Sequence, residues 1–148
     1  MALEHELRVR FGEADPQGIV FNAHYVAWFD IAVTELFRAA LGSWAALNEG
    51  GVDLVVAEIN VRFLSPARAD DLVVLRTWVE EIGTTSMRSV VEVRRDSELL
   101  VDGRLRHVFV DGQAWTKTPV PAFVRDALAP YVTPAPQAAS APPASSGS

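Results

Sequence analysis

The sequence predicts an α+β domain in which one curved, mainly antiparallel sheet wraps around one long central helix. Three observations lead to this prediction: an alternating segment near the N-terminus, one long segment with helical periodicity, and four long strand-like segments after it. The helical segment is apolar around most of its circumference, and such a helix is normally covered by other structure. One sheet cannot close completely over one helix, so its exposed edges lead us to expect at least a dimer.

The first half of the chain is predicted to hold a strand, a turn-rich loop and the helix. Residues 5–11 alternate between polar and apolar side chains, as a half-buried strand does. A loop rich in Gly, Asp and Pro follows at 12–18. Large apolar residues then recur at helical spacing through 21–39. We expect Asn22 to cap the start of this helix and Gly42 to end it.

The second half is predicted to be a strand meander. The turn residues Gly83 and Asp96-Ser97 lie between long segments rich in Val, Leu and Thr, as expected for hairpins. A short helical segment follows Pro121, at 122–129. The four strands are predicted at 54–63, 72–82, 85–95 and 98–110.

Composition limits the domain count and the class of partner. The chain has 148 residues, enough for one domain, which we place at 1–132. Residues 133–148 consist almost entirely of Ala, Pro, Ser and Gly and are predicted to be a disordered tail. The net charge of −6 argues against nucleic acid or a membrane surface as a partner.

Other chemistries are excluded by what the sequence lacks. It has no cysteine, and its three histidines are widely spaced, so we expect no thiol nucleophile and no metal site. No apolar run is long enough to span a bilayer, and no secretory signal precedes the first strand. A cytoplasmic location is the simplest expectation.

Asp15 is the main candidate for chemistry. It lies in the loop just before the helix, beside the apolar run 19–21, where partial desolvation would strengthen it as a base. The first helical turn presents unpaired N–H groups and the positive end of the helix dipole. A carboxylate beside such an oxyanion site suits acyl transfer or hydrolysis. The alternative is that Asp15 only holds backbone amides in a turn, which is common for Asp before Pro.

Asp30 is a second unusual residue. It falls between two large apolar residues, and its spacing of eight from Asn22 places both near one helix face. The alternative is a solvated position, paired with Arg38.

Two segments give the sequence a family resemblance. RVRFGEADPQGIVFNAHYVAWFDIAVTEL resembles the opening of hotdog-fold acyl-CoA thioesterases of the 4-hydroxybenzoyl-CoA thioesterase family. The family pattern corresponds here to the run from Asp15 to Phe21, then Tyr25, then Trp28-Phe29-Asp30. NVRFLSPARADDLV is similar to a later strand and bend of the same family. The resemblance covers roughly residues 7–128.

The resemblance implies a mechanism and an assembly. Asp15 would be the catalytic carboxylate, attacking the thioester or activating water, and the backbone N–H of Asn22 would polarise the thioester carbonyl. The site would lie at the interface of a homodimer or homotetramer. No cofactor is implied, because coenzyme A belongs to the acyl-CoA or aryl-CoA substrate.

The resemblance also implies substrate contacts. Asp30 matches an Asp that contacts the ring hydroxyl in the 4-hydroxybenzoyl-CoA branch, whereas the short-chain acyl-CoA branch tends to carry Glu, so we expect an aryl-CoA. The family's basic cluster for coenzyme A phosphates is replaced here by Gly83-Thr84-Thr85-Ser86, with Arg88 close behind. The expected substrate-binding residues are Gly18, Tyr25, Asp30, Arg62, Ser86 and Arg88.

Two other classes of function remain open from the sequence. One is a non-catalytic module on the same fold that binds acyl-CoA or aromatic acids, because a fold does not fix a function. The other is a cystatin-like cone of helix and curved sheet that uses Asp as the base of an isomerase. That fold usually has more than one helix before its sheet, and it would be favoured if residues 6–11 did not pair into the sheet.

Overall fold

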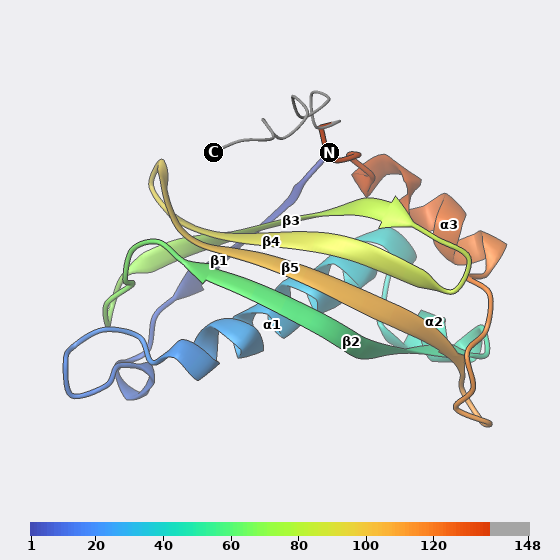
Figure 1. Cartoon of the computed structure of the whole chain (residues 1–148), viewed down its shortest axis with the longest axis horizontal. Coiled ribbons are helices and arrows are strands. Elements are labelled where there is room, and N and C mark those ends of the chain that lie inside the picture. The colour runs from blue at the N-terminus through green and yellow to red at the C-terminus, as the bar shows by residue number, and fades with distance from the viewer. Residues whose placement is uncertain (137–148) are drawn as a thin grey trace, which may run out of the picture.

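A five-stranded sheet and one long helix make up most of the computed structural model, which describes residues 1–136 (Figure 1). No helix within these residues is long and apolar enough to cross a membrane. In chain order the elements are β1 (Leu3–Arg8), η1 (Phe11–Glu13), α1 (Asn22–Leu41), α2 (Ala45–Glu49), β2 (Val52–Phe63), β3 (Leu72–Ile82), β4 (Ser86–Arg95), β5 (Glu98–Asp111), α3 (Ala122–Leu128) and η2 (Ala129–Tyr131).

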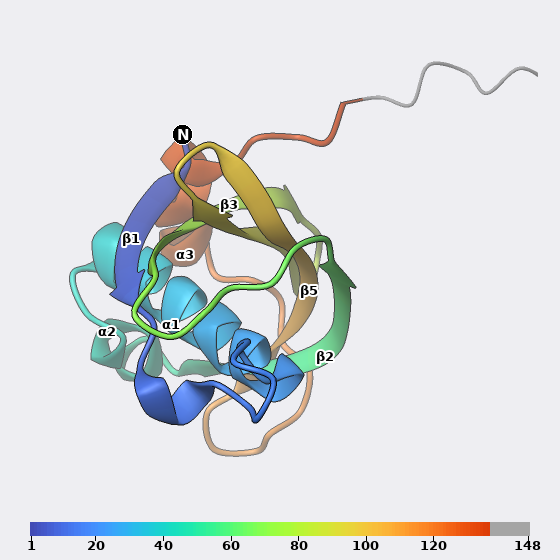
Figure 2. The same ribbon diagram turned by 90° about the vertical axis from the view of Figure 1, so that its left-hand side faces the viewer.

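The sheet is antiparallel throughout and curves around α1 (Figure 2). Its strand order is β1-β3-β4-β5-β2. The predicted meander is confirmed for β3, β4 and β5, but it is wrong for β2, which pairs with β5 instead of β3. The cause is the segment 64–71, which passes over the start of α1, where the N–H of Val20 donates to the carbonyl of Ala67 at 2.9 Å. The crossing leaves β2 at one end of the sheet.

Helix α1 packs its apolar side into the concave face of the sheet. It lies close to Gly103 in β5, where a Cβ would lie only 2.5 Å from the ring of Phe29. Residues 103, 105, 107 and 109 of β5 share this inner face, because strand side chains alternate. Gly42 ends α1 as predicted, with a φ of 88° and an N–H that donates to the carbonyl of Arg38. The buried residues of α1 are Tyr25, Trp28, Phe29, Ala32, Val33, Leu36 and Phe37.

The N-terminal strand is shorter than the sequence predicts. β1 covers Leu3–Arg8 rather than 5–11, because the carboxylate of Glu13 accepts the N–H of Arg10 and turns the chain into η1. β1 nevertheless pairs with β3 along its whole length, including residues 6–8, which argues against the cystatin-like alternative. The one-turn helix α2 was not predicted from the sequence.

The C-terminal part covers one end of the barrel-like sheet. α3 buries Val124 and Leu128 against the core, and the N–H of Thr133 donates to the carbonyl of Val79 at 2.8 Å. Most of the predicted disordered tail lies outside the described residues.

Candidate active site

A small hairpin before α1 holds Asp15. Ala14 and Val20 form an isolated bridge, and the N–H of Asp15 donates to the carbonyl of Ile19 at 2.8 Å. The turn closes where the N–H of Gly18 donates to the carbonyl of Asp15 at 2.9 Å. Gly18 has a φ of 80°, a conformation that side chains disfavour, so this glycine is needed for the turn. The contribution of Gly18 is therefore to the geometry of the loop.

Only one of the two carboxylate oxygens of Asp15 takes part in the turn. Its Oδ1 accepts the N–H of Gln17 at 2.8 Å, which is the structural role that the sequence left open. Its Oδ2 has no hydrogen-bond partner within residues 1–136. Asp15 is partly buried. One oxygen is thus held in place by the backbone while the other is available for chemistry.

The start of α1 provides two free backbone donors. The N-cap is Phe21, with extended backbone and no side-chain cap, so the prediction of Asn22 as N-cap is wrong. Asn22 is the first helical residue, and neither its N–H nor that of Ala23 has a backbone acceptor in the described part of the chain. Both residues are exposed. These N–H groups lie at the positive end of a 20-residue helix, where the sequence analysis expects an oxyanion site.

Glu13 is a buried carboxylate at this site that the sequence did not reveal. Its residue is 5% exposed, and its Oε2 accepts the indole N–H of Trp28 at 2.7 Å. Burial alone would raise the pKa of Glu13, but hydrogen bonds from Arg10 and Trp28 outweigh it and hold the pKa below its usual value. The spacing of Glu13 and Trp28 carries no recognisable sequence pattern, because the contact depends on how the loop folds back on the helix.

Tyr25 and Arg68 connect the hairpin to the β2–β3 segment. Tyr25 is buried, and its hydroxyl accepts the N–H of Ala67 at 3.1 Å. Its ring lies edge-on to Trp28 and near Phe63. Ile19 forms a bridge with Arg68, so this exposed cation lies next to the Asp15 hairpin. Tyr25 thus fixes the β2–β3 segment beside the hairpin. Arg68 is a candidate for binding an anion next to Asp15.

Asp30 lies on the open side of α1, about 12 Å along the helix from Asn22 at 1.5 Å per residue. It is exposed and pairs with no cation among residues 1–136; Arg38 pairs with Glu35 instead. His107, on the inner face of β5, is close enough for the charge of Asp30 to act on it. Burial lowers the pKa of His107 to about 4, and Asp30 opposes part of this change. Nδ1 of His107 is buried without a hydrogen-bond partner from the described residues.

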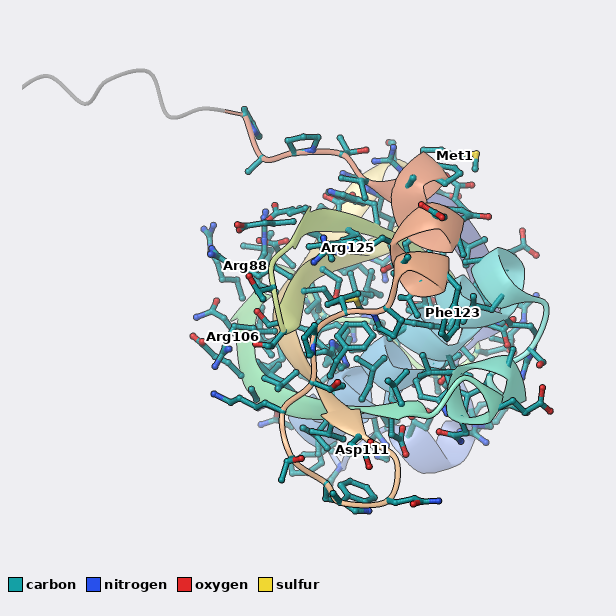
Figure 3. All side chains as sticks on the ribbon, turned by 90° about the vertical axis from the view of Figure 1, so that its right-hand side faces the viewer. Met1, Arg88, Arg106, Asp111, Phe123 and Arg125 are labelled. Carbon is teal, nitrogen blue, oxygen red and sulfur yellow. The ribbon has the colours of Figure 1, made fainter. Side chains whose placement is uncertain are left out.

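Of the other predicted substrate-binding residues, Ser86 and Arg88 are separated from Asp15 within one chain, whereas Arg62 adjoins Phe63, whose ring lies 5.7 Å from that of Tyr25. The β3–β4 turn, which carries Ser86, lies at the opposite end of the sheet from the hairpin (Figure 1). Figure 3 shows Arg88 and Arg106 projecting from the sheet on the side away from α1. Arg88 lines a hollow of about 320 Å³ there, together with Glu58 and Arg104. Arg62 is exposed on β2.

No group of three or more His, Asp or Glu side chains in the described residues is placed to hold a metal ion. The site therefore offers a carboxylate, backbone donors and nearby aromatic surface. This set suits nucleophilic or general-base attack on a carbonyl, with the oxyanion held by the start of a helix.

The fold and this site define a hotdog-type domain, and comparison with known proteins identifies the family. The family model of the thioesterase superfamily matches residues 17–101, a range that contains Asn22, Tyr25 and Asp30 and begins two residues after Asp15. The chain belongs to this superfamily, and it is a thioester hydrolase.

Named relatives and solved structures agree with this assignment. The chain is 32% identical over 106 residues to the acyl-CoA thioester hydrolase YbgC of Escherichia coli O157:H7, covering 71% of this chain and 79% of that protein. It is 31% identical over 77 residues to the 4-hydroxybenzoyl-CoA thioesterase of Pseudomonas sp. (strain CBS-3), covering 50% and 55%. The structure of a gentisyl-coenzyme A thioesterase matches with a TM-score of 0.76 and 25% identity, covering 86% of this chain and 99% of that one.

Proposed function

We propose that the chain hydrolyses aryl-CoA thioesters, with 4-hydroxybenzoyl-CoA as the model substrate, using Asp15 and the start of α1. In its coarser form, as an acyl-CoA thioesterase, the function follows from the family and the relatives. The observation that supports the proposed mechanism is that Oδ2 of Asp15, in the hairpin that leads into α1, and the N–H groups of Asn22 and Ala23, at the start of α1, all lack hydrogen-bond partners among residues 1–136.

The proposed reaction uses each group for one task. The N–H of Asn22 donates to the thioester oxygen and stabilises the negative charge that develops there. Oδ2 of Asp15 either attacks the carbonyl carbon or removes a proton from the attacking water. In the general-base route the hydroxide adds to the carbonyl carbon, the C–S bond breaks, and the proton held by Asp15 passes to the thiolate of coenzyme A. In the nucleophilic route the C–S bond breaks as the acyl group is transferred to Asp15, and a water then hydrolyses this anhydride, releasing the free acid and the proton that the thiolate takes up. The hydrogen bond from Gln17 keeps the carboxylate oriented throughout.

The acyl group is proposed to extend along the open side of α1 towards Asp30. Val26 on this side is 39% exposed, and Val56 and Ile59 on the neighbouring inner face of β2 are 50% and 36% exposed. An aromatic ring suits this apolar surface, and a ring hydroxyl suits the unpaired carboxylate of Asp30. Two relatives whose names specify aryl-CoA substrates, 4-hydroxybenzoyl-CoA and gentisyl-CoA, support this choice over a short aliphatic chain.

We also propose that two copies of the chain form a homodimer through β2, and that two such dimers can form a tetramer. β2 ends the strand order, so one edge of this 12-residue strand lacks a partner strand among the described residues. A second copy joined at this edge would cover the exposed apolar residues of β2 and place the acyl group between two subunits. The contribution of Ser86 and Arg88 to coenzyme A binding is proposed on this basis, because a second copy would bring its β3–β4 end towards the Asp15 hairpin, whereas Arg62 lies at the hairpin end of its own subunit.

Replacing Asp15 with Asn tests the reaction. Thiol release from 4-hydroxybenzoyl-CoA should fall at least about 100-fold, since a positioned base or nucleophile contributes that much or more. Asn keeps an oxygen for the N–H of Gln17, so the turn should survive, and circular dichroism with a melting curve checks this. A folded D15N variant that keeps more than a tenth of the wild-type rate would rule out Asp15 as the key group. A panel of short-chain thioesters turned over faster than aryl ones would instead support the short-chain alternative.

A further inference from the structure

The buried carboxylate of Glu13 contacts the three parts of the molecule that meet at the proposed site. Its Oε1 accepts the backbone N–H of Arg10 at 2.8 Å, and its Oε2 accepts the indole N–H of Trp28 at 2.7 Å. Its own carbonyl accepts the N–H of Phe21 at 3.0 Å. One residue thus ties together η1, the body of α1 and the N-cap of α1.

These contacts bear directly on the distance between the two proposed catalytic groups. Glu13 lies two residues before Asp15, and Phe21 lies one residue before Asn22. The bridge between Ala14 and Val20 is the next pair in the same hairpin. A shift of Glu13 therefore moves Asp15 relative to the free N–H groups of α1, and displacements of about 1 Å can cost about 100-fold in rate.

The environment of Glu13 makes it an anchor rather than a surface charge. Trp28 is 1% exposed and packs edge-on against Tyr25, with ring centroids 5.0 Å apart. Tyr25 in turn holds the N–H of Ala67. The indole ring of Trp28 is therefore held firmly in the core. The hydrogen bond from its N–H to the charged carboxylate of Glu13 is stronger than one between neutral groups. The guanidinium of Arg10, by contrast, is largely exposed and makes longer contacts of 3.3 and 3.4 Å.

We propose that Glu13 is a positioning residue for thioester hydrolysis: its buried carboxylate fixes the Asp15 hairpin to Trp28 and so sets the alignment of Asp15 with the start of α1. Glu13 does not touch substrate and exchanges no proton in the reaction. This inference rests on the proposed function, in which Asp15 and the start of α1 carry the chemistry.

Replacing Glu13 with Gln is the central test. Gln has nearly the same shape but only one acceptor oxygen, and because the N–H of Arg10 and the indole N–H of Trp28 reach different oxygens of Glu13, one of the two donors would face the NH₂ group instead. We expect kcat for 4-hydroxybenzoyl-CoA to fall about 10- to 100-fold with KM changed less than about threefold, because ground-state binding elsewhere in the pocket is intact. E4Q removes a glutamate that is 66% exposed in its side chain and serves as the matched control, with kcat expected to stay unchanged.

A double-mutant cycle with Asp15 separates positioning from general stability. If Glu13 acts through Asp15, E13Q should reduce kcat strongly in the wild-type background and have little further effect in the D15N background. A purely structural role would lower the rate by a similar factor in both backgrounds. R10A should change kcat less than about threefold, because the backbone N–H of Arg10 and the indole of Trp28 still hold the carboxylate.

A measurement that needs no activity follows the anchor itself. The indole N–H resonance of Trp28, assigned with a W28F variant, should move upfield in E13Q, and its hydrogen exchange should accelerate. All rates are measured well below the melting temperature of each variant. If E13Q folds poorly, E13D serves as a second variant, because it keeps the charge on a shorter side chain.

The outcomes distinguish this inference from the proposed function. An inactive wild type, or an active D15N variant, would overturn the proposed function. An active wild type and an inactive D15N variant, together with an E13Q variant of unchanged kcat or equal effects in both backgrounds, would overturn the positioning role alone.

Discussion

Asp15 holds a turn with one carboxylate oxygen, and the other oxygen is the one that we propose takes part in the reaction. Its Oδ1 holds the N–H of Gln17, while its Oδ2 faces no partner in residues 1–136. The two interpretations that the sequence left open for this residue are therefore compatible, one for each oxygen. A carboxylate fixed by one oxygen loses less freedom when the other reacts, which favours catalysis.

Gly18 sets the turn that holds Asp15, and G18A tests this. No atom lies within 4 Å of a Cβ added at Gly18, so the cost comes from its φ of 80° alone. We expect the free energy of unfolding to fall by roughly 1–2 kcal/mol, measured by urea denaturation. G12A is the control, because Gly12 has an equally open environment and no positive φ. Equal stability of the two variants would contradict the strain argument.

Asp30 is proposed to select the acyl group, and D30A tests its role. Turnover of 4-hydroxybenzoyl-CoA should fall about 10-fold or more, because a hydrogen bond to a charged group contributes about 1.5–3 kcal/mol. Turnover of benzoyl-CoA should change much less, since its ring has no hydroxyl to bind. E35A removes a carboxylate from the same helix that is paired with Arg38 and should affect both substrates alike. If D30A also affected the two equally, Asp30 would lie outside the acyl pocket.

At the scale of elements, β2 is one of the two edge strands of the sheet, and with 12 residues it is longer than the other edge strand, β1, which has 6. β3, β4 and β5 each have two neighbouring strands, whereas β2 has only β5 within the described sheet. Its inner face is only partly covered, and Val56 and Phe63 remain 50% and 52% exposed. An edge strand with apolar side chains is a site for pairing with another chain.

I59K tests whether β2 forms the subunit interface. A charged side chain at the centre of this edge should be tolerated in a single chain, because Ile59 is 36% exposed, but it should disfavour pairing of two copies. We expect a shift to monomer in size-exclusion chromatography with light scattering, together with lost activity if the site needs both subunits. L72K introduces the same charge at a residue that is 42% exposed and lies away from β2, and it should leave the assembly unchanged. An I59K variant that stays oligomeric would place the interface elsewhere.

For the whole molecule, acid stability should be set by buried titratable groups. The native pKa of His107 is about 4, below the ordinary value of 6.5, so between these values the unfolded chain binds a proton that the folded chain does not. The contribution of His107 to the free energy of unfolding is fully present above pH 6.5 and is lost as the pH falls towards 4. The loss amounts to about 3 kcal/mol at most. Glu13 and Asp71, whose pKa values are lowered from 4.5 and 3.8, add a further loss below those values.

H107L should remove the loss of stability that His107 causes between pH 6.5 and 4. The free energy of unfolding, measured by urea denaturation at pH 7.0, 5.5 and 4.5, should decline clearly less for H107L than for the wild type over this range. Below pH 4 the two proteins should lose stability in parallel, because the carboxylates remain. An identical slope in both proteins above pH 4.5 would show that His107 is not the group that titrates.

Much of this protein follows from the sequence alone, because its signals are local. Alternation and helical periodicity predict β3 and α1 closely, and Gly42 marks the end of α1, since each pattern reflects neighbouring residues on one element. The loop motif around Asp15, followed by a helix, is likewise contiguous in the sequence. The family resemblance depends on the same short segments, and the comparisons confirm it.

Tertiary structure alone decided which distant residues meet. The place of β2 beside β5 depends on the crossing of 64–71 over α1, and no local pattern encodes that path. The bond between Glu13 and Trp28 joins residues 15 apart on two elements, and it exists because the loop folds back onto the helix. The sequence by itself therefore determined the elements and the candidate carboxylate, whereas packing determined which of its oxygens is free and what holds it in place.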